Sequence, residues 1–178
     1  LGADGLIIDL EDAVAITEKD AARILVCEYL NTFETTSDVF VRINPLDSPF
    51  FYKDLDEIKN LNITGIVLPK ASVESMEALD KYLTENNLDF KVIGLIETAM
   101  GLEMALQILS KSKKVIGVLL GAEDLTLDLG AKRTKKSDEI AYARSRIIAV
   151  SKALQIEAID TPFTDTDDYE GLKIDALN

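Results

Sequence analysis

Two carboxylates, Glu97 and Asp124, follow strongly apolar stretches of the chain, VIGLI at 92–96 and VLLGA at 118–122. Two carboxylates that share one site repel each other, and a divalent cation removes that repulsion. Oxygen-only ligation by two carboxylates, completed by water or substrate, suits Mg2+. Each residue could instead cap the helix that follows its strand. The spacing alone leaves the metal site and the capping roles both open.

Two cations occupy comparable places. Arg42 lies in VFVRINP and Lys70 in VLPKAS. A guanidinium at a strand end can bind a carboxylate through two hydrogen bonds or stabilise an enolate oxygen; the alternative for Arg42 is a structural ion pair with Asp9 or Glu11. Lys70 could form a Schiff base or an ion pair. Because a Schiff-base lysine needs a lowered pKa and acids abound here, we favour the ion pair.

Three acids, Asp9, Glu11 and Asp12, crowd the sequence LIIDLEDAV. If the strand runs through them, Asp9 and Glu11 share one face and Asp12 lies on the other. These carboxylates could assist a metal through water, orient Arg42 or carry protons.

The composition excludes several kinds of chemistry. The 178 residues include no histidine, which rules out Ser-His-Asp and Cys-His triads and HExxH metal sites. A net charge of −13 argues against nucleic acid and anionic membranes as partners, and no apolar run is long enough to span a bilayer. The single cysteine, Cys27, is expected in the core, and one cysteine suits a reducing, cytoplasmic location.

The elements that position these groups repeat along the chain. Short β-branched runs alternate with segments of helical periodicity, which predicts a parallel sheet covered by helices. The predicted strands are 6–12, 39–44, 65–70, 92–98, 118–124 and 156–162. A doubly wound sheet and a (β/α)8 barrel both fit, and polar residues at all six carboxyl ends favour the barrel. No GxGxxG or P-loop motif follows any strand.

A complete barrel of this kind needs about 250 residues. We therefore predict that residues 1–178 form one incomplete TIM-barrel catalytic domain from which the first and last strands are missing. Two polar segments stay ambiguous. Asp160 is expected to serve a turn or cap, and one basic cluster is either a solvated loop or a site for an anionic ligand tail. That cluster comprises Lys132, Arg133, Lys135 and Lys136.

Six motifs occur in a specific order: DLEDAV, VRIN, LPK, IET, GAEDL followed by DLG, and AIDTPF. In this order and at these spacings they resemble the HpcH/HpaI aldolase family, which includes citrate lyase beta subunits and malyl-CoA lyases. The resemblance covers essentially the whole chain. It implies a (β/α)8 barrel, a trimer or hexamer, and Mg2+-dependent cleavage of a carbon–carbon bond in a 3-hydroxyacyl thioester.

The same resemblance implies roles for individual residues. Glu97 and Asp124 would hold the metal, Arg42 would bind or polarise the substrate, and the acids Asp9, Glu11 and Asp12 would line the site. Lys70 and Glu97 are also expected to contact the substrate. Without histidine the general base should be a carboxylate, which relatives can draw from the C-terminal region of a neighbouring subunit. Relatives also carry a further initial strand with a basic residue, and a closing strand, which are expected to be missing from residues 1–178.

The resemblance leaves the substrate open. The thioester could be carried by coenzyme A or by an acyl carrier protein, alone or within a citrate lyase complex, and the acid half could be citryl or malyl. A metal-dependent aldolase of 4-hydroxy-2-oxo acids and a degenerate barrel that serves as a scaffold subunit are the alternatives.

Overall fold

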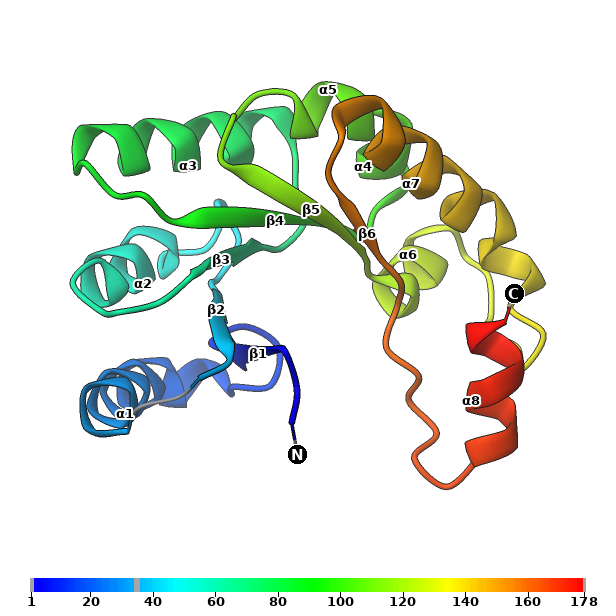
Figure 1. The fold of residues 1–178 in the computed structure, drawn as a ribbon, viewed down its shortest axis with the longest axis horizontal. Helices are drawn as coiled ribbons and strands as arrows, with labels where there is room; N and C mark the ends of the chain where they lie inside the picture. The colour runs from blue at the N-terminus through cyan, green and yellow to red at the C-terminus, as the bar shows by residue number, and fades with distance from the viewer. Residues whose placement is uncertain (1, 34–35, 178) are drawn as a thin grey trace.

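Six parallel strands form one curled sheet in the computed structural model, which describes residues 2–33 and 36–177; neighbouring strands in the sheet follow the chain order β1 to β6 (Figure 1). The strands are β1 Gly5–Asp9, β2 Asp38–Arg42, β3 Gly65–Leu68, β4 Lys91–Ile96, β5 Val115–Leu120 and β6 Glu157–Ile159. All six lie where the sequence predicts them. This confirms a parallel β/α fold, and the curvature makes it a half-barrel rather than a flat doubly wound sheet.

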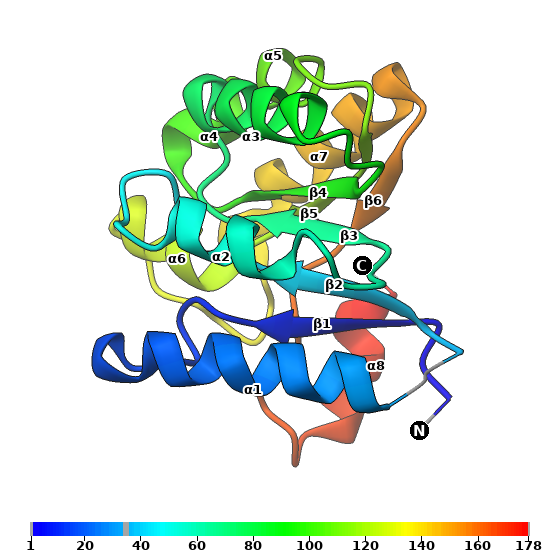
Figure 2. The same cartoon turned by 90° about the vertical axis from the view of Figure 1, so that its left-hand side faces the viewer.

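Helices follow the strands in turn. They are η1 Ile16–Glu18, α1 Lys19–Thr32, α2 Phe51–Ile58, α3 Val73–Glu85, α4 Ala99–Glu103, α5 Ala105–Leu109, α6 Ala122–Asp128, η2 Asp138–Ile140, α7 Ala141–Leu154 and α8 Tyr169–Ala176. The larger helices α1, α2, α3 and α7 lie on the convex side of the sheet, and α8 lies apart from that layer (Figures 1 and 2). No helix in the described ranges is long and apolar enough to cross a membrane.

The predicted strands extend further than the observed ones at their carboxyl ends. The clearest correction concerns β1, which ends at Asp9, so that Glu11 and Asp12 lie in a turn and not on a strand. The two-residue alternation predicted for Asp9, Glu11 and Asp12 is therefore wrong. The acids interrupt the strand because Asp9 accepts hydrogen bonds from the amides of Glu11 and Ala13, which bends the backbone away from the ladder.

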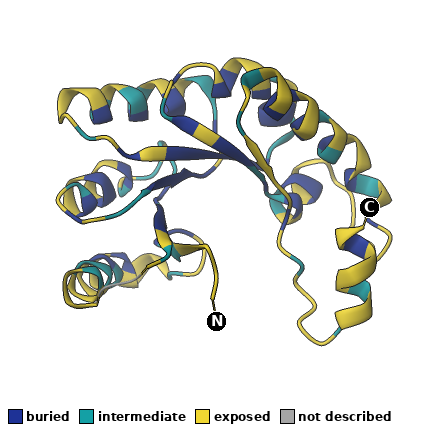
Figure 3. Ribbon diagram, viewed as in Figure 1, coloured by how far each residue is buried: buried dark blue, intermediate teal, exposed yellow. Residues whose placement is uncertain are grey.

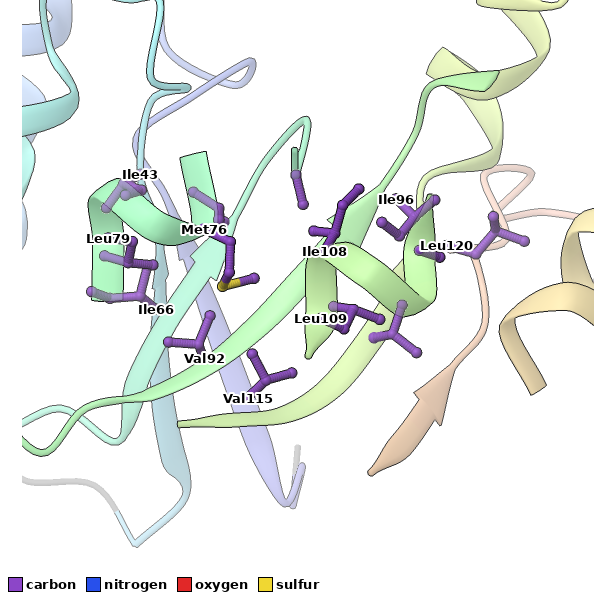
Figure 4. Close-up of a cluster of buried hydrophobic side chains, with 14 of the residues drawn as sticks. Ile43, Ile66, Met76, Leu79, Val92, Ile96, Ile108, Leu109, Val115 and Leu120 are labelled. Carbon is purple, nitrogen blue, oxygen red and sulfur yellow. The ribbon is translucent and has the colours of Figure 1, made fainter. Parts of the chain in front are cut away.

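Apolar side chains fill both faces of the sheet. Those on the convex face pack against the helices and form the main core; Ile66, Val92, Ile96 and Leu120 are among them (Figure 4). A second cluster on the opposite face comprises Phe40, Val67, Ile93 and Leu95, with Leu119 packed against it. Because successive strand residues alternate between faces, this second cluster identifies the face that points into the half-barrel.

Burial falls off toward both edges of the sheet (Figure 3). Every residue of β3 is buried, whereas β6 is exposed throughout and β1 is exposed over Gly5–Ile7. In the described residues each edge strand pairs on one side only, β1 with β2 and β6 with β5.

Candidate functional site

The carboxyl ends of the strands surround a pocket of about 170 Å³. Its charged lining includes Asp12, Arg42, Glu97 and Asp124, and Thr161, Pro162 and Thr164 line it on the β6 side. The structure thus brings together four of the residues selected from the sequence. The side chains of Glu11 and Lys70 lie next to this group, at the end of β1 and of β3.

Strand alternation explains why Arg42 and Glu97 face the pocket. Arg42 is two residues beyond Phe40, and Glu97 is two residues beyond Leu95. Both Phe40 and Leu95 belong to the cluster on the inner face. Residues two apart on a strand share a face, so the two charged groups continue the inner apolar columns at the point where the sheet ends.

Arg42 forms a bidentate ion pair with Asp9. The Arg42 Nε lies 2.7 Å from Asp9 Oδ1, and its Nη2 donates to Asp9 Oδ2. The hydrogen bonds to Asp9 raise the pKa of Arg42 in spite of its burial. Burial works against ionised Asp9, but Arg42 and the amides of Glu11 and Ala13 lower the pKa of this carboxyl. The ion pair between Arg42 and Asp9 is present, and it orients the guanidinium at the pocket wall, where a substrate role stays open.

Glu11 is a buried carboxylate without hydrogen bonds. Its side chain is 3% exposed, and neither carboxylate oxygen has a hydrogen-bond partner in the described part of the chain. Two cations flank it: Arg42 Nη1 lies 3.4 Å from Glu11 Oε2, and Lys70 Nζ lies 3.6 Å from Oε1. Burial raises the pKa of Glu11, the charges of Asp12 and Asp9 add to that shift, and the two cations oppose it.

Lys70 turns the chain at the end of β3. Its backbone is in the left-handed region, with φ 45°, and its amide donates to Glu97 Oε1 at 2.7 Å. Such a backbone costs a lysine about 1 kcal/mol. Partial burial disfavours the ammonium, but the carboxylates around it, Glu11 first, raise the pKa of Lys70. This is the opposite of what a Schiff-base lysine requires, and it supports the ion-pair interpretation.

Glu97 lies deep at the floor of the pocket. It is 4% exposed, and burial raises its pKa to about 7, although the Lys70 amide opposes that shift; Glu11 and Asp124 add to it. A Cβ placed on Gly121 would lie 2.8 Å from Glu97 Oε2, so only a glycine leaves room for this carboxylate. The capping alternative fails for Glu97, because Thr98 is the residue that caps α4.

Asp124 stands in the first turn of α6, where the N-cap position is Gly121 and no side chain caps the helix. Glu97 and Asp124 both line the pocket, and burial there makes negative charge costly. Two carboxylates of this kind are a donor set that fits Mg2+. No group of three or more Asp, Glu, Cys or His side chains in the described ranges is arranged to hold a metal. A cation here would therefore draw its other ligands from water and substrate.

Sequence reasoning missed a buried polar network under the first loop. In it, Arg23 and Asn44 of the VRIN motif donate to Asp54, and Lys19 and Asn44 both donate to the Leu10 carbonyl. Asp54 is fully buried although it lies on the apolar face of α2, between Phe51 and Ile58. A carboxylate at a core position of an amphipathic helix was the available signal, because a buried charge needs a partner.

The remaining sequence-selected residues have structural contacts. Cys27 is partly buried and packs against the main core, as predicted. Asp160, predicted to serve a turn or cap, instead pairs with Arg144 of α7, whose Nη2 lies 2.8 Å from Asp160 Oδ2, and it accepts from the adjacent Thr161 amide. The basic cluster is not simply solvated. Arg133 pairs with Glu123 and Glu139, and Lys135 pairs with Asp165 and Asp168, so both cations are already neutralised by acids.

A curled parallel β/α sheet with carboxylates and an arginine at its carboxyl ends defines a half-barrel whose candidate site lies at the face where barrel enzymes carry their active sites. Comparison with known proteins then identifies the group. The sequence profile of the HpcH/HpaI aldolase/citrate lyase family matches residues 1–177, and the chain belongs to this family.

Curated relatives align with nearly the whole chain. It is 38% identical to the citrate lyase subunit beta of Leuconostoc mesenteroides subsp. cremoris over 96% of this chain and 59% of that protein. It is 30% identical to the mitochondrial citramalyl-CoA lyase of Rattus norvegicus, over 97% of this chain and 56% of that protein. The chain thus spans about three fifths of the length of these relatives.

Solved structures share the fold. RipC from Yersinia pestis superposes with a TM-score of 0.87 and 32% identity, over 99% of this chain and 78% of that one. The citrate lyase beta subunit of Mycobacterium tuberculosis complexed with oxaloacetate and magnesium superposes with a TM-score of 0.81 and 32% identity. The match covers 98% of this chain and 75% of that one. CitE from the same organism, solved with magnesium, acetoacetate and coenzyme A, superposes with a TM-score of 0.83 and 31% identity. The match covers 98% of this chain and 63% of that one.

Proposed function

We propose that the protein carrying this chain is a Mg2+-dependent carbon–carbon lyase that cleaves a 3-hydroxyacyl thioester. The preferred substrate is a citryl thioester, which would give oxaloacetate and an acetyl thioester; malyl and citramalyl thioesters are the related choices. The observation that carries the proposal is one pocket lined by the carboxylates Glu97 and Asp124 and by Arg42. Membership of the family and the two lyases among the relatives support it.

Glu97 and Asp124 would hold the metal. A bound Mg2+ supplies Lewis-acid polarisation and a template for the oxygens of the acid half of the substrate. The raised pKa of Glu97 supports this assignment, because a carboxylate that is costly to ionise alone gains most from a nearby cation. Metal-bound relatives from M. tuberculosis add further support.

Arg42 would stabilise negative charge on the substrate. Cleavage of the carbon–carbon bond leaves an enolate on the thioester half, and a guanidinium fixed in advance stabilises such a developing charge without reorganisation. Asp9 fixes Arg42 through two hydrogen bonds. The ammonium of Lys70, 44% exposed, adds positive charge at the same rim and offers a contact for a substrate carboxylate.

A base must remove the hydroxyl proton of the substrate, and the sequence has no histidine for this task. Among the sequence-selected acids, Asp9 is committed to Arg42 and Glu97 to the proposed metal. Asp12 is exposed and lines the pocket, so we assign the removal of the proton to it. If Asp12→Asn retains full activity, Asp12 is not the base, and another carboxylate, either Glu123 of the same pocket or one from a neighbouring subunit, takes the proton.

The wider setting extends the same proposal. We infer a catalytic domain in which residues 1–178 form most of a (β/α)8 barrel that further strands complete. The substrate carrier is coenzyme A or an acyl carrier protein, and a trimer or hexamer, within a citrate lyase complex or alone, is the expected assembly. The single cysteine favours a reducing location such as the cytoplasm.

The test is a cleavage assay with the full-length protein on citryl-CoA, citramalyl-CoA, malyl-CoA and citryl acyl carrier protein, with and without EDTA. The proposal expects cleavage of at least one thioester and its loss on chelation. Activity that EDTA leaves intact would overturn the metal assignment. Cleavage restricted to free 4-hydroxy-2-oxo acids would identify the aldolase alternative, and Mg2+ binding that is equal in wild type and Glu97→Gln would identify a scaffold.

A further inference from the structure

Lys19, at the first position of α1, has an unusual environment for an ammonium. It is 7% exposed, and no carboxylate in the described ranges forms an ion pair with it. Its partners are two backbone carbonyls: Lys19 Nζ lies 2.7 Å from Leu10 O and 2.6 Å from Glu11 O. Burying a charge without a counterion is costly, so a stabilising role alone does not account for this lysine.

The two carbonyls do not depend on Lys19 for a hydrogen bond. Leu10 O also accepts from Asn44 Nδ2 at 2.9 Å, and Glu11 O also accepts from the Val14 amide at 3.0 Å. Removal of the ammonium would therefore leave neither acceptor unsatisfied. What Lys19 adds is a clamp on two consecutive peptide groups of the turn after β1.

That turn carries Glu11, whose carboxylate has no hydrogen bonds of its own. The position of this buried charge between Arg42 and Lys70 therefore rests on its backbone and on the attraction of the two cations at 3.4 and 3.6 Å. A small shift of the turn would change both separations. Because misplacement of a charged group by about 1 Å can cost a hundredfold in rate, the turn is a sensitive part of the site.

A second support holds the same turn from the β2 side. Asn44, which donates to Leu10 O, is itself fixed by Asp54 Oδ2 through its amide at 2.8 Å and its Nδ2 at 2.6 Å. Arg23 Nη1 binds the other oxygen of Asp54 at 2.9 Å. Lys19 and Arg23 are four residues apart on α1 and so lie on one side of that helix. One helix thus supports the turn directly and, through Asp54 and Asn44, indirectly.

We propose that Lys19 is a positioning residue of the site, which clamps the turn at Leu10–Glu11 and thereby holds the Glu11 carboxylate between Arg42 and Lys70. Its kinetic consequence rests on the proposed function, whereas the clamp itself does not. The two claims are therefore tested by separate measurements.

The clamp is tested by hydrogen exchange in the full-length protein carrying Lys19→Met, which keeps the length of the side chain and removes its charge and donors. Lys91→Met is the matched control, since Lys91 is exposed and begins β4 at the opposite end of the sheet. We expect the Glu11 and Ala13 amides, which Asp9 binds, to exchange about tenfold faster in Lys19→Met only, with an unchanged Tm. Exchange at the wild-type rate would overturn the proposal, and so would a matching fall in Tm.

The kinetic arm measures thioester cleavage. Lys19→Met should lower kcat by about ten- to a hundredfold with little change in KM, and Lys19→Arg, which keeps the charge and donors, should recover most of it. In a Glu11→Gln background Lys19→Met should cause no further loss, because Lys19 acts through Glu11. Independent, multiplicative losses would overturn the proposal. If no thioester is cleaved by the wild type, the proposed function fails, and the exchange rates alone decide the clamp.

Discussion

The two sides of the pocket handle charge in opposite ways. On the β1–β2 side, Asp9 and Arg42 face each other through two hydrogen bonds, and each shifts the pKa of the other toward the charged form. On the β4–β5 side, Glu97 has a carboxylate neighbour in Asp124, and burial raises its pKa to about 7. The Asp9–Arg42 pair balances its own charge, whereas Glu97 and Asp124 carry negative charge that a cation would relieve.

The two sides therefore suit different catalytic tasks: one holds a charged group in a fixed geometry, and the other binds a cation. The paired side is rigid before a ligand arrives, which suits a group that must meet developing charge in a fixed geometry. The acidic side binds a cation that then contributes the strongest local charge. Both kinds of group lie at adjacent strand ends, so the distinction arises from their neighbours and not from the strands that carry them.

Removal of the acidic side should have the largest effect. Glu97→Gln deletes one charged ligand, and we expect kcat to fall about a thousandfold, since metal assistance supplies several kcal/mol. Titration calorimetry with Mg2+ should show a matching loss of affinity. Glu74→Gln, which makes the same change at an exposed carboxylate on α3, is the control and should change neither quantity. Unchanged Mg2+ affinity in Glu97→Gln would contradict the assignment.

Disruption of the paired side should cost less. Arg42→Lys keeps the charge but cannot reproduce the bidentate contact with Asp9, and we expect kcat/KM to fall about a hundredfold with wild-type Mg2+ affinity. Steady-state kinetics and calorimetry measure the two quantities separately. Arg146→Lys on α7 provides the same change away from the pocket. A joint loss of catalysis and Mg2+ affinity would mean that the two sides are not distinct.

The pH dependence of stability should differ between the metal-free and metal-bound protein. Because the folded-state pKa of Glu97 is raised from 4.5 to about 7, the folded state holds more protons than the unfolded state in this range. Stability without metal should therefore fall as pH rises from 4.5 to 7, by on the order of 2 kcal/mol. The raised pKa of Glu11 acts in the same direction.

Thermal unfolding between pH 4.5 and 8, with EDTA or with Mg2+, measures this effect. Saturating Mg2+ should flatten the decline, and Glu97→Gln should reduce it in EDTA. A metal-free protein whose stability rises across the range would show that Glu97 ionises easily in the fold.

The basic segment should have the smallest effect. Lys135 is 82% exposed and pairs with Asp168 and Asp165, and exposed ion pairs contribute little. We expect Lys135→Ala to leave kcat, KM and Tm within experimental error of the wild type. An increase in KM for CoA thioesters alone would instead make this segment part of the substrate site.

Most of the fold follows from local patterns. Short apolar runs that alternate with segments of helical periodicity predict the six strands and a parallel sheet covered by helices, because strands buried on both faces are apolar throughout. The same patterns select Arg42, Glu97 and Asp124, which end apolar strands or open the next helix. Periodicity also places Arg42 and Glu97 on the inner face, since each extends a column of inner residues.

The neighbours of each charge depend on contacts that periodicity does not encode. Asp9 and Glu11 are two residues apart in one acidic motif, yet the pKa of Asp9 is lowered and that of Glu11 is raised. Asp9 pairs with Arg42, 33 positions along the chain, while Glu11 is buried in a turn that Lys19 clamps. The sequence by itself determined which ionisable groups reach the carboxyl ends of the sheet. Only the tertiary structure decided which of them are paired and which are buried without hydrogen bonds, because pairing and desolvation arise when distant segments pack together.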